Sequence, residues 1–198
     1  IHCFVGQVTA RRGCEVFLPA TKKASCNYVI GYDGSIGLCV DEGDRSWCSS
    51  SSANDNRAVT IETASDNRAP YAVTEKAYSA LLDLVTDICR RNGAKKLLWF
   101  GDKDKTLSYT PKDGEMVMTV HRWFANKSCP GDYLYERHGE IAAEVTRRLE
   151  EEDDDMDQTK FNEMFSAAMA EYRKKLRDND SGDWSQEARE WAVSVGLF

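Results

Sequence analysis

Residues 74–100 read TEKAYSALLDLVTDICRRNGAKKLLWF, and this stretch decides the fold class. Its longer part predicts a helix over 74–91, which Thr74 can cap and Asn92-Gly93 ends. The apolar residues recur at spacings of three and four, the period of a helix with one buried face: Tyr78, Leu81, Leu82, Val85, Ile88 and Cys89. The run 96–100 then predicts a strand. A helix interleaved with strands in this way is typical of an α/β domain.

Further strands and a second helix are predicted on both sides of this stretch. The turn Asp33-Gly34 separates two short apolar runs, which indicates a hairpin. The predicted segments are a first strand that contains His2, the hairpin strands 28–31 and 36–40, strands 58–62 and 116–121, and a helix over 132–149. Together they predict a mixed central β-sheet flanked by helices, with a helical C-terminal tail.

The net charge of −7 is unevenly distributed along the 198 residues. Residues 150–198 carry 14 acidic and 6 basic side chains (−8), whereas residues 1–149 carry 19 acidic and 20 basic ones (+1). Seven of the eight residues 150–157 are acidic, and such a run repels itself. We therefore expect a folded domain over 1–149, an acidic linker over 150–158 and a helical tail over 159–198. Neither part has the basic stripe that nucleic acid requires, which argues against that partner.

The tail contains an apolar stripe at helical spacing over residues 161–176: Phe161, Met164, Phe165, Ala168, Met169, Tyr172 and Leu176. This face either packs on the front domain or mediates self-association, and the sequence favours neither.

No apolar run approaches the roughly 18 residues of a membrane span. The seven cysteines form no C-x-x-C pair and indicate a reducing compartment, so synthesis in the cytoplasm is expected.

Three residues could hold a metal ion. His2 lies on the first strand, His121 ends the strand 116–121, and Cys129 follows eight residues later. A catalytic zinc ion takes three protein ligands and leaves one position for water, and two imidazoles with a thiolate meet that need. A buried core histidine with a buried thiol fits the spacing too, as does a thiol hydrolase with Cys129 as nucleophile and His121 as base. Spacing alone leaves these interpretations open.

Five blocks of sequence add a second argument, because they follow one another in the order of a known family. They are Ile1-His2-Cys3, Asn27 to Gly34, Arg45-Ser46-Trp47, Asn54 to Glu62, and Thr119 to Gly131. The series resembles the type-2 N-acetylmuramoyl-L-alanine amidases, which are related to the peptidoglycan recognition proteins. More narrowly, it resembles the amidase domains of endolysins from phages of clostridial-type hosts. The resemblance covers residues 1–149 and implies zinc-dependent hydrolysis of the amide between N-acetylmuramic acid and L-alanine in peptidoglycan.

The resemblance assigns roles to five residues. It places the Zn²⁺ ligands at His2, His121 and Cys129. It implies that Glu62 carries a proton from the attacking water to the leaving nitrogen, and that Lys127 stabilises the charge that develops on the carbonyl oxygen. The alternatives are a Glu62 that only hydrogen-bonds a metal ligand, and a Lys127 that is merely solvated on its loop.

Substrate contacts are expected from four residues: Asn27, Trp47, Asn56 and Arg57. Side-chain amides match the hydroxyl and acetamido groups of a glycan, and an exposed Trp ring stacks on a sugar. Trp47 could equally be a core residue, and Arg57 could form a surface ion pair rather than bind a peptide carboxylate.

Three other positions bear on the site. Cys26 stands where some family members have a catalytic tyrosine, so that role is absent here or passes to Glu62. Cys3 alternates to the opposite face of the strand from His2, so we expect it in the core. His138 lies among charged residues of the second predicted helix, and we expect it at the surface.

The resemblance implies a bacteriolytic enzyme that acts on the bacterial cell wall during phage-type host lysis. A non-catalytic peptidoglycan-binding module of the same fold is the alternative, but such relatives usually lose the cysteine ligand, and Cys129 is present. In the tail, the segment from Trp184 to Phe198 looks like the opening of an S-layer-homology-like unit. We therefore expect residues 159–198 to include the truncated start of a wall-binding region.

Overall fold

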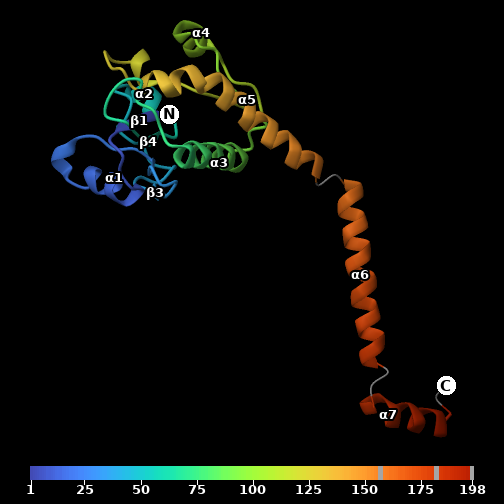
Figure 1. Ribbon diagram of the computed structural model, residues 1–198. Helices are drawn as coiled ribbons and strands as arrows, with labels where there is room; N and C mark the ends of the chain where they lie inside the picture. Colours follow the sequence, from blue (N-terminus) through green and yellow to red (C-terminus); the bar gives the residue numbers. More distant parts are fainter. Residues whose placement is uncertain (156–157, 181–182, 197–198) are drawn as a thin grey trace. The chain divides into compact units, whose positions relative to one another are not determined.

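The computed structural model describes residues 1–155, 158–180 and 183–196 (Figure 1). The strands are β1 (His2–Val5), β2 (Tyr28–Ile30), β3 (Ile36–Leu38), β4 (Ile61–Ser65), β5 (Lys96–Leu98) and β6 (Glu115–Val117). The helices are α1 (Ala10–Phe17), α2 (Ser52–Asp55), α3 (Glu75–Arg91), α4 (Lys103–Ser108), α5 (Gly131–Asp155), α6 (Gln158–Asp180) and α7 (Asp183–Ser194), with 3-10 turns η1 (Ala20–Lys22) and η2 (His121–Trp123). The predicted α/β class is confirmed.

The main sheet is mixed, with the strand order β1-β4-β2-β3. Strand β4 pairs in parallel with both β1 and β2, and β3 pairs antiparallel with β2. The predicted hairpin is therefore present, and Gly34 in its turn has a φ of +84°, a conformation that glycine adopts without steric cost. The strand predicted over 58–62 begins later, at Ile61, because Thr60 is hydrogen-bonded to Asn27 instead.

The strand predicted over 116–121 is shorter than expected and lies in a separate sheet. It ends at Val117 as β6 and pairs in parallel with β5 only. The chain makes one more contact with β5, from Met118 N to Leu98 O at 2.9 Å, and then turns into η2. His121 therefore begins a 3-10 turn and does not end a strand.

The core lies between the main sheet and helices α3 and α5. Helix α3 runs from Glu75 to Arg91 as the periodicity predicts, and the Thr74 side chain accepts a hydrogen bond from Ala77 N. Its apolar face packs with residues of β2, β4 and α5: Leu81, Val85 and Ile88 with Ile30, Ile61, Leu134, Ile141 and Val145. Helices α3 and α5 lie side by side (Figure 1), and Arg148 of α5 binds Asp83 of α3 at 2.7 Å.

The chain divides into two compact units, Ile1–Glu150 and Glu151–Phe198. The acidic stretch expected to be a linker over 150–158 is helical as far as Asp155, where α5 ends. Glutamate is a good helix former, and extending an existing helix requires no new nucleation. Residues 156 and 157 lie outside the described residues. The proposed division into domain, linker and tail stays a prediction.

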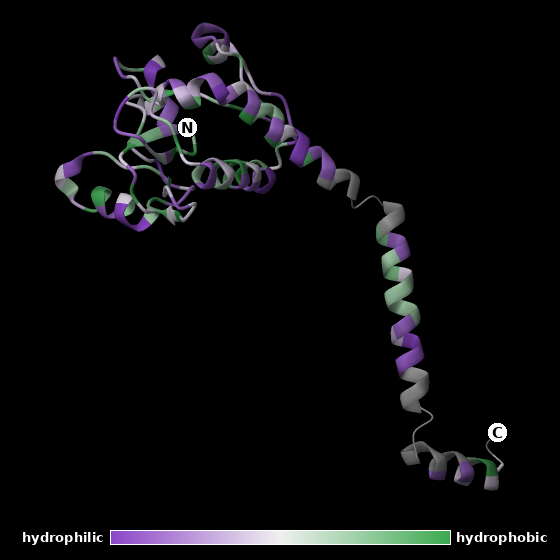
Figure 2. Ribbon diagram, viewed as in Figure 1, coloured by the Kyte–Doolittle hydropathy of each residue, from purple (hydrophilic) through white to green (hydrophobic). Residues whose placement is uncertain are grey.

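The second unit contains α6 and α7. The stripe predicted over 161–176 lies on α6, which continues to Asp180. Phe161, Met164, Phe165 and Tyr172 are exposed, and the rings of Phe161 and Phe165 stack with centroids 5.9 Å apart. Figure 2 shows hydrophobic and hydrophilic segments following one another along this helix. None of the described helices combines the length and apolar composition that a membrane crossing needs. Self-association through α6 stays a prediction.

Candidate metal centre

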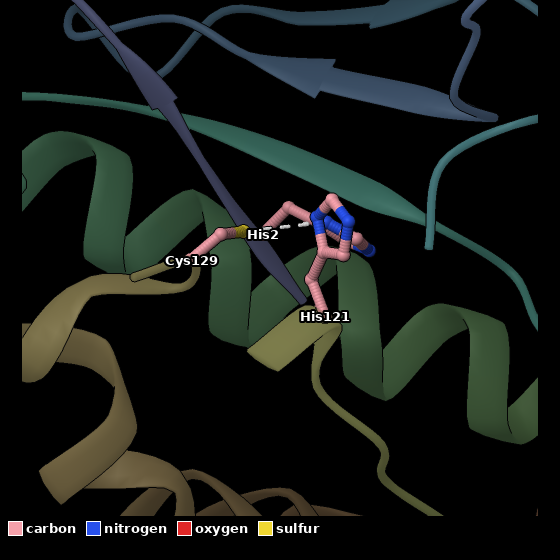
Figure 3. Close-up of side chains that lie close together, drawn as sticks. All are labelled: His2, His121 and Cys129. Atoms are coloured by element: carbon pink, nitrogen blue, oxygen red, sulfur yellow. Dashed lines mark hydrogen bonds between the residues drawn. The ribbon is translucent and has the colours of Figure 1, made fainter. Parts of the chain in front are cut away.

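Three predicted metal ligands converge from distant parts of the chain. His2 lies on β1, His121 on η2 and Cys129 in the loop that leads into α5, and one ligand atom from each lies within 4.8 Å of the others. Figure 3 shows the three side chains pointing toward one another. Cys129 Sγ is 3.4 Å from His2 Nδ1, and the two imidazole rings are 5.2 Å apart between centroids, tilted by 56°. Two nitrogens and a sulfur at this separation form a donor set that suits zinc.

Backbone hydrogen bonds close the loop that carries two of these residues. Arg122 N donates to Cys129 O at 3.1 Å, which joins the two ends of the segment. Gly131 follows with a φ of +79°, and a Cβ at this position would lie 2.7 Å from Tyr71 Cβ. The close approach of the two chains therefore requires glycine here, and it fixes the start of α5 beside the centre.

Burial favours the metal-binding form of His2 but not that of Cys129. Burial lowers the pKa of His2 well below its usual value, so the imidazole is neutral and its lone pairs are available. Hydrogen bonding with Cys3 and burial raise the pKa of the Cys129 thiol. A divalent cation would reverse that effect, because metal binding favours the thiolate. Cys3 is buried as expected, but its thiol interacts with Cys129 and so lies next to the centre.

Glu62 lies beside His2 across two paired strands. The two residues are in register between β4 and β1, and burial raises the pKa of Glu62 to about 7. Glu62 Oε2 is buried and has no hydrogen-bond partner among the described residues. Its other oxygen, Oε1, is 3.6 Å from Cys48 Sγ. A buried carboxyl with a pKa near neutrality can both accept and release a proton at working pH.

Cys48 was not predicted from the sequence, yet it belongs to the centre. His2, Cys48 and Glu62 form a second group whose ligand atoms lie within 4.8 Å of one another. The buried carboxylate of Asp55 holds this part of the chain, because it accepts hydrogen bonds from Cys48 N at 3.2 Å and Ser49 N at 3.0 Å. No local motif marks Cys48; the only signal is its place directly after the block Arg45-Ser46-Trp47.

Ser50 is a second residue that sequence reasoning missed. Its Oγ lies 2.9 Å from His121 Nε2 and orients the imidazole. The hydrogen bond leaves Nδ1 as the ring nitrogen of His121 that is free to face a metal. Nearby, Thr119 Oγ1 donates to Asn54 Oδ1 at 2.9 Å and ties α2 to the segment before η2.

The structure corrects the expectation for Asn27, which is not available to a substrate. The side chain is 1% exposed, and its amide nitrogen donates to Val40 O at 3.2 Å and Asp41 O at 3.0 Å. Its amide oxygen accepts from Thr60 N at 2.9 Å. All of its hydrogen-bonding capacity serves the loop after β3 and the start of β4, so Asn27 has a structural role.

The other predicted contact residues are accessible and lie at two different hollows. Asn56 and Arg57 are exposed and line a cavity of about 1120 Å³ together with Ser50, Lys103 and Trp123. Trp47 is 57% exposed, which rules out a core role. It borders a separate shallow hollow of about 250 Å³, with the Arg45 guanidinium 5.4 Å from the centroid of its ring. Lys127 is exposed on the loop between His121 and Cys129.

His138 is not at the surface, contrary to expectation. It is fully buried on α5, where its Nδ1 lies 2.6 Å from Leu134 O and its ring lies 4.6 Å from that of Trp99. Trp99 also stacks on Trp123 of η2, with ring planes inclined by only 2°. His138 therefore belongs to an aromatic cluster that packs against η2 through Trp123. Burial lowers the pKa of His138 to about 3.

A comparison with protein families places most of the chain in a known family. The family model described as N-acetylmuramoyl-L-alanine amidase matches residues 1–132, which include all three residues of the candidate centre as well as Glu62 and Lys127. A comparison with curated proteins found no match.

Proposed function

Because the chain belongs to the N-acetylmuramoyl-L-alanine amidase family, we propose that it is a zinc hydrolase that cleaves the amide between N-acetylmuramic acid and L-alanine in bacterial peptidoglycan. The observation that carries this proposal is the convergence of His2, His121 and Cys129 within 4.8 Å. Residues 2 and 129 are 127 positions apart in the sequence, yet Cys129 Sγ and His2 Nδ1 lie 3.4 Å apart.

The donor set supports zinc at this centre. His2 is buried and neutral, Ser50 orients His121, and Cys129 supplies a soft sulfur ligand. Three protein ligands are the number that a catalytic zinc site uses, with water as the fourth ligand. When bound, zinc supplies Lewis-acid chemistry, because it polarises a carbonyl group and lowers the pKa of water.

We assign the competing group of His2, Cys48 and Glu62 to a different role. His2 cannot bind two separate ions that lie so close together, and we assign proton transfer to the Glu62 carboxyl. Glu62 has a buried, unpartnered oxygen and a pKa of about 7, which suits a group that takes a proton from the attacking water and then delivers it to the alanine nitrogen. Cys48 holds the other carboxyl oxygen in place.

Lys127 is proposed to stabilise the negative charge that develops on the carbonyl oxygen. It lies two residues before Cys129 on a loop whose ends are joined by a backbone hydrogen bond, and its ammonium group is exposed. A fixed positive charge is most effective where charge appears only in the transition state.

The cavity beside the centre is proposed to receive the substrate. It is lined by Ser50, Asn56, Arg57 and Trp123, which combine hydroxyl, amide and cationic groups with an aromatic surface. This chemistry matches a glycan with an attached peptide, since sugars need amide and hydroxyl partners and stem peptides carry carboxylates. Trp47 and Arg45 would contact a more distant part of the same polymer.

The biological role follows from the resemblance of the sequence blocks to endolysin amidase domains. We propose synthesis in the cytoplasm, action on the cell wall and a part in phage-type host lysis. The tail would then help to hold the enzyme on the wall. The second candidate, a non-catalytic peptidoglycan-binding module, is less well supported because the complete donor set of His2, His121 and Cys129 is present.

End-group analysis of digested peptidoglycan tests the proposal. The amidase should release new N-terminal alanine, lose this activity on treatment with a chelator, and regain it when zinc is added. New reducing sugars would instead identify a glycosidase. Loss of activity on alkylation with no response to chelation would identify a thiol hydrolase, and a binding module would bind walls without releasing either end group.

A further inference from the structure

Three cysteines that are not among the predicted metal ligands gather around the hairpin of β2 and β3. Cys14 lies on α1, Cys39 directly follows β3, and Cys26 precedes β2. The thiols of Cys14 and Cys39 form a hydrogen-bonded pair with their sulfur atoms 3.0 Å apart. Cys39 is also hydrogen-bonded with Cys26, which is fully buried, whereas Cys14 and Cys39 are only partly buried.

The backbone is shaped to bring the first two thiols together. Helix α1 packs against β3 (Figure 1), and β3 has a glycine, Gly37, at the point of contact. A Cβ at Gly37 would lie 2.6 Å from Cys14 Sγ, so only glycine leaves space for the thiol. Sulfur atoms at 3.0 Å need to move by only about 1 Å to reach the bonding distance of a disulfide.

We propose that Cys14 and Cys39 form a disulfide bond when the protein leaves a reducing environment, and that this bond ties α1 to the edge strand β3. The oxidant is a small-molecule disulfide of the glutathione type. The Cys39 thiolate attacks one sulfur of the oxidant, breaks its S–S bond and releases one thiol. Cys14 then attacks the Cys39 sulfur of the mixed disulfide and releases the second thiol. Two electrons pass to the oxidant, and the two protons of the cysteine thiols end on the released thiols.

Two observations favour Cys39 as the attacking thiol and Cys14 as its partner. Hydrogen bonds with Cys26 and Cys14 lower the pKa of Cys39, which increases the thiolate fraction. Cys26 is 0% exposed and lies inside the core, whereas the partly exposed Cys14 can be reached by a mixed disulfide on Cys39. Residues 14 and 39 are 25 positions apart, and a bond between them restrains the unfolded chain.

Treatment of the full chain with glutathione disulfide tests this proposal. We expect two of the seven thiols to disappear, the mass to fall by two hydrogens, and Tm to rise by roughly 5–10 °C, reversibly with a reducing agent. Trypsin leaves Cys26 and Cys39 on one peptide, 24–45, so a second protease that cuts at Asp33 is needed to identify the bonded pair. The expected product joins Cys14 to Cys39.

Matched variants decide between the possible pairs. Cys14→Ser and Cys39→Ser should each abolish the rise in Tm, and Cys26→Ala should retain it. A bond between Cys26 and Cys39, a bond between Cys3 and Cys129, or seven thiols still free would overturn the proposal. The peptide map of the unmodified chain keeps the test decisive even if a variant does not fold. None of these measurements depends on amidase activity, so this inference can fail while the proposed function stands.

Discussion

Two groups of side chains share His2, and they differ in chemistry although each contains a cysteine. One group adds His121 and Cys129 from the segment 121–129, and the other adds Cys48 and Glu62 from the segment 48–62. The first offers soft donors that suit zinc, whereas the second contains a buried carboxyl with a pKa of about 7. On the proposed assignment, the first group binds the metal and the second transfers a proton, so the neighbours of each cysteine set its role.

The same substitution, cysteine to serine, should have different effects in the two groups. Cys129→Ser should lose bound zinc and reduce wall hydrolysis to background, because a catalytic zinc site needs all three protein ligands. Cys48→Ser should retain one zinc ion per chain. Metal content by elemental analysis and end-group release from purified walls measure the two effects. Loss of zinc from Cys48→Ser, with zinc kept in Cys129→Ser, would exchange the roles of the two groups.

Glu62→Gln should produce the next largest effect. The amide cannot carry a proton, so kcat should fall by about 10²–10⁴ while zinc content stays unchanged. Release of dye from labelled walls over a range of pH gives the rate. If Glu62 is a metal ligand instead, the variant loses zinc together with activity, and the assignment to proton transfer is wrong.

The same variant should also change how stability depends on pH in the metal-free protein. The folded-state pKa of Glu62, about 7, lies above the ordinary value of 4.5, so the native state holds a proton that the unfolded state releases between these values. The contribution of Glu62 to stability is present below about pH 4.5 and is lost as pH rises to about 7. Denaturant titrations should show this fall in the wild type and a smaller one in Glu62→Gln.

Lys127→Ala should cost less than the loss of Glu62, about 10²–10³ in kcat, if its charge stabilises the carbonyl oxygen in the transition state. Zinc content and KM should change little. Lys112→Ala, which removes another exposed lysine of the same unit, is the matched control and should behave as wild type. A decrease below tenfold for Lys127→Ala would mean that this lysine is only solvated.

Asn27→Ala should have the smallest effect on catalysis and a clear effect on folding. It leaves Thr60 N and two loop carbonyls without partners, which should lower the free energy of unfolding by about 1–3 kcal/mol. Thermal unfolding measures this loss. Asn56→Ala, at an exposed position of the cavity, should leave Tm unchanged and raise KM. An unchanged Tm in Asn27→Ala would restore the earlier expectation of a substrate contact.

Several elements of the fold could be predicted because their signals are local. The spacing of Leu81, Val85 and Ile88 predicted α3 nearly to the residue, and Asp33-Gly34 predicted the hairpin of β2 and β3. These patterns reflect hydrogen bonds and burial within a few turns or one hairpin. By contrast, the end of β6 at Val117 and the burial of His138 depend on partners elsewhere in the chain, such as β5 and Trp99.

Residue patterns alone were enough to infer the α/β class, the family and the candidate ligands His2, His121 and Cys129. Three other features became visible only in the folded chain. Cys48 and Ser50 lie next to these ligands, Asn27 binds the loop after β3, and the thiols of Cys14 and Cys39 are in contact. The difference comes from the range of the interactions. Periodicity records which face of an element is buried, whereas contacts between side chains many residues apart are set by how whole elements pack together.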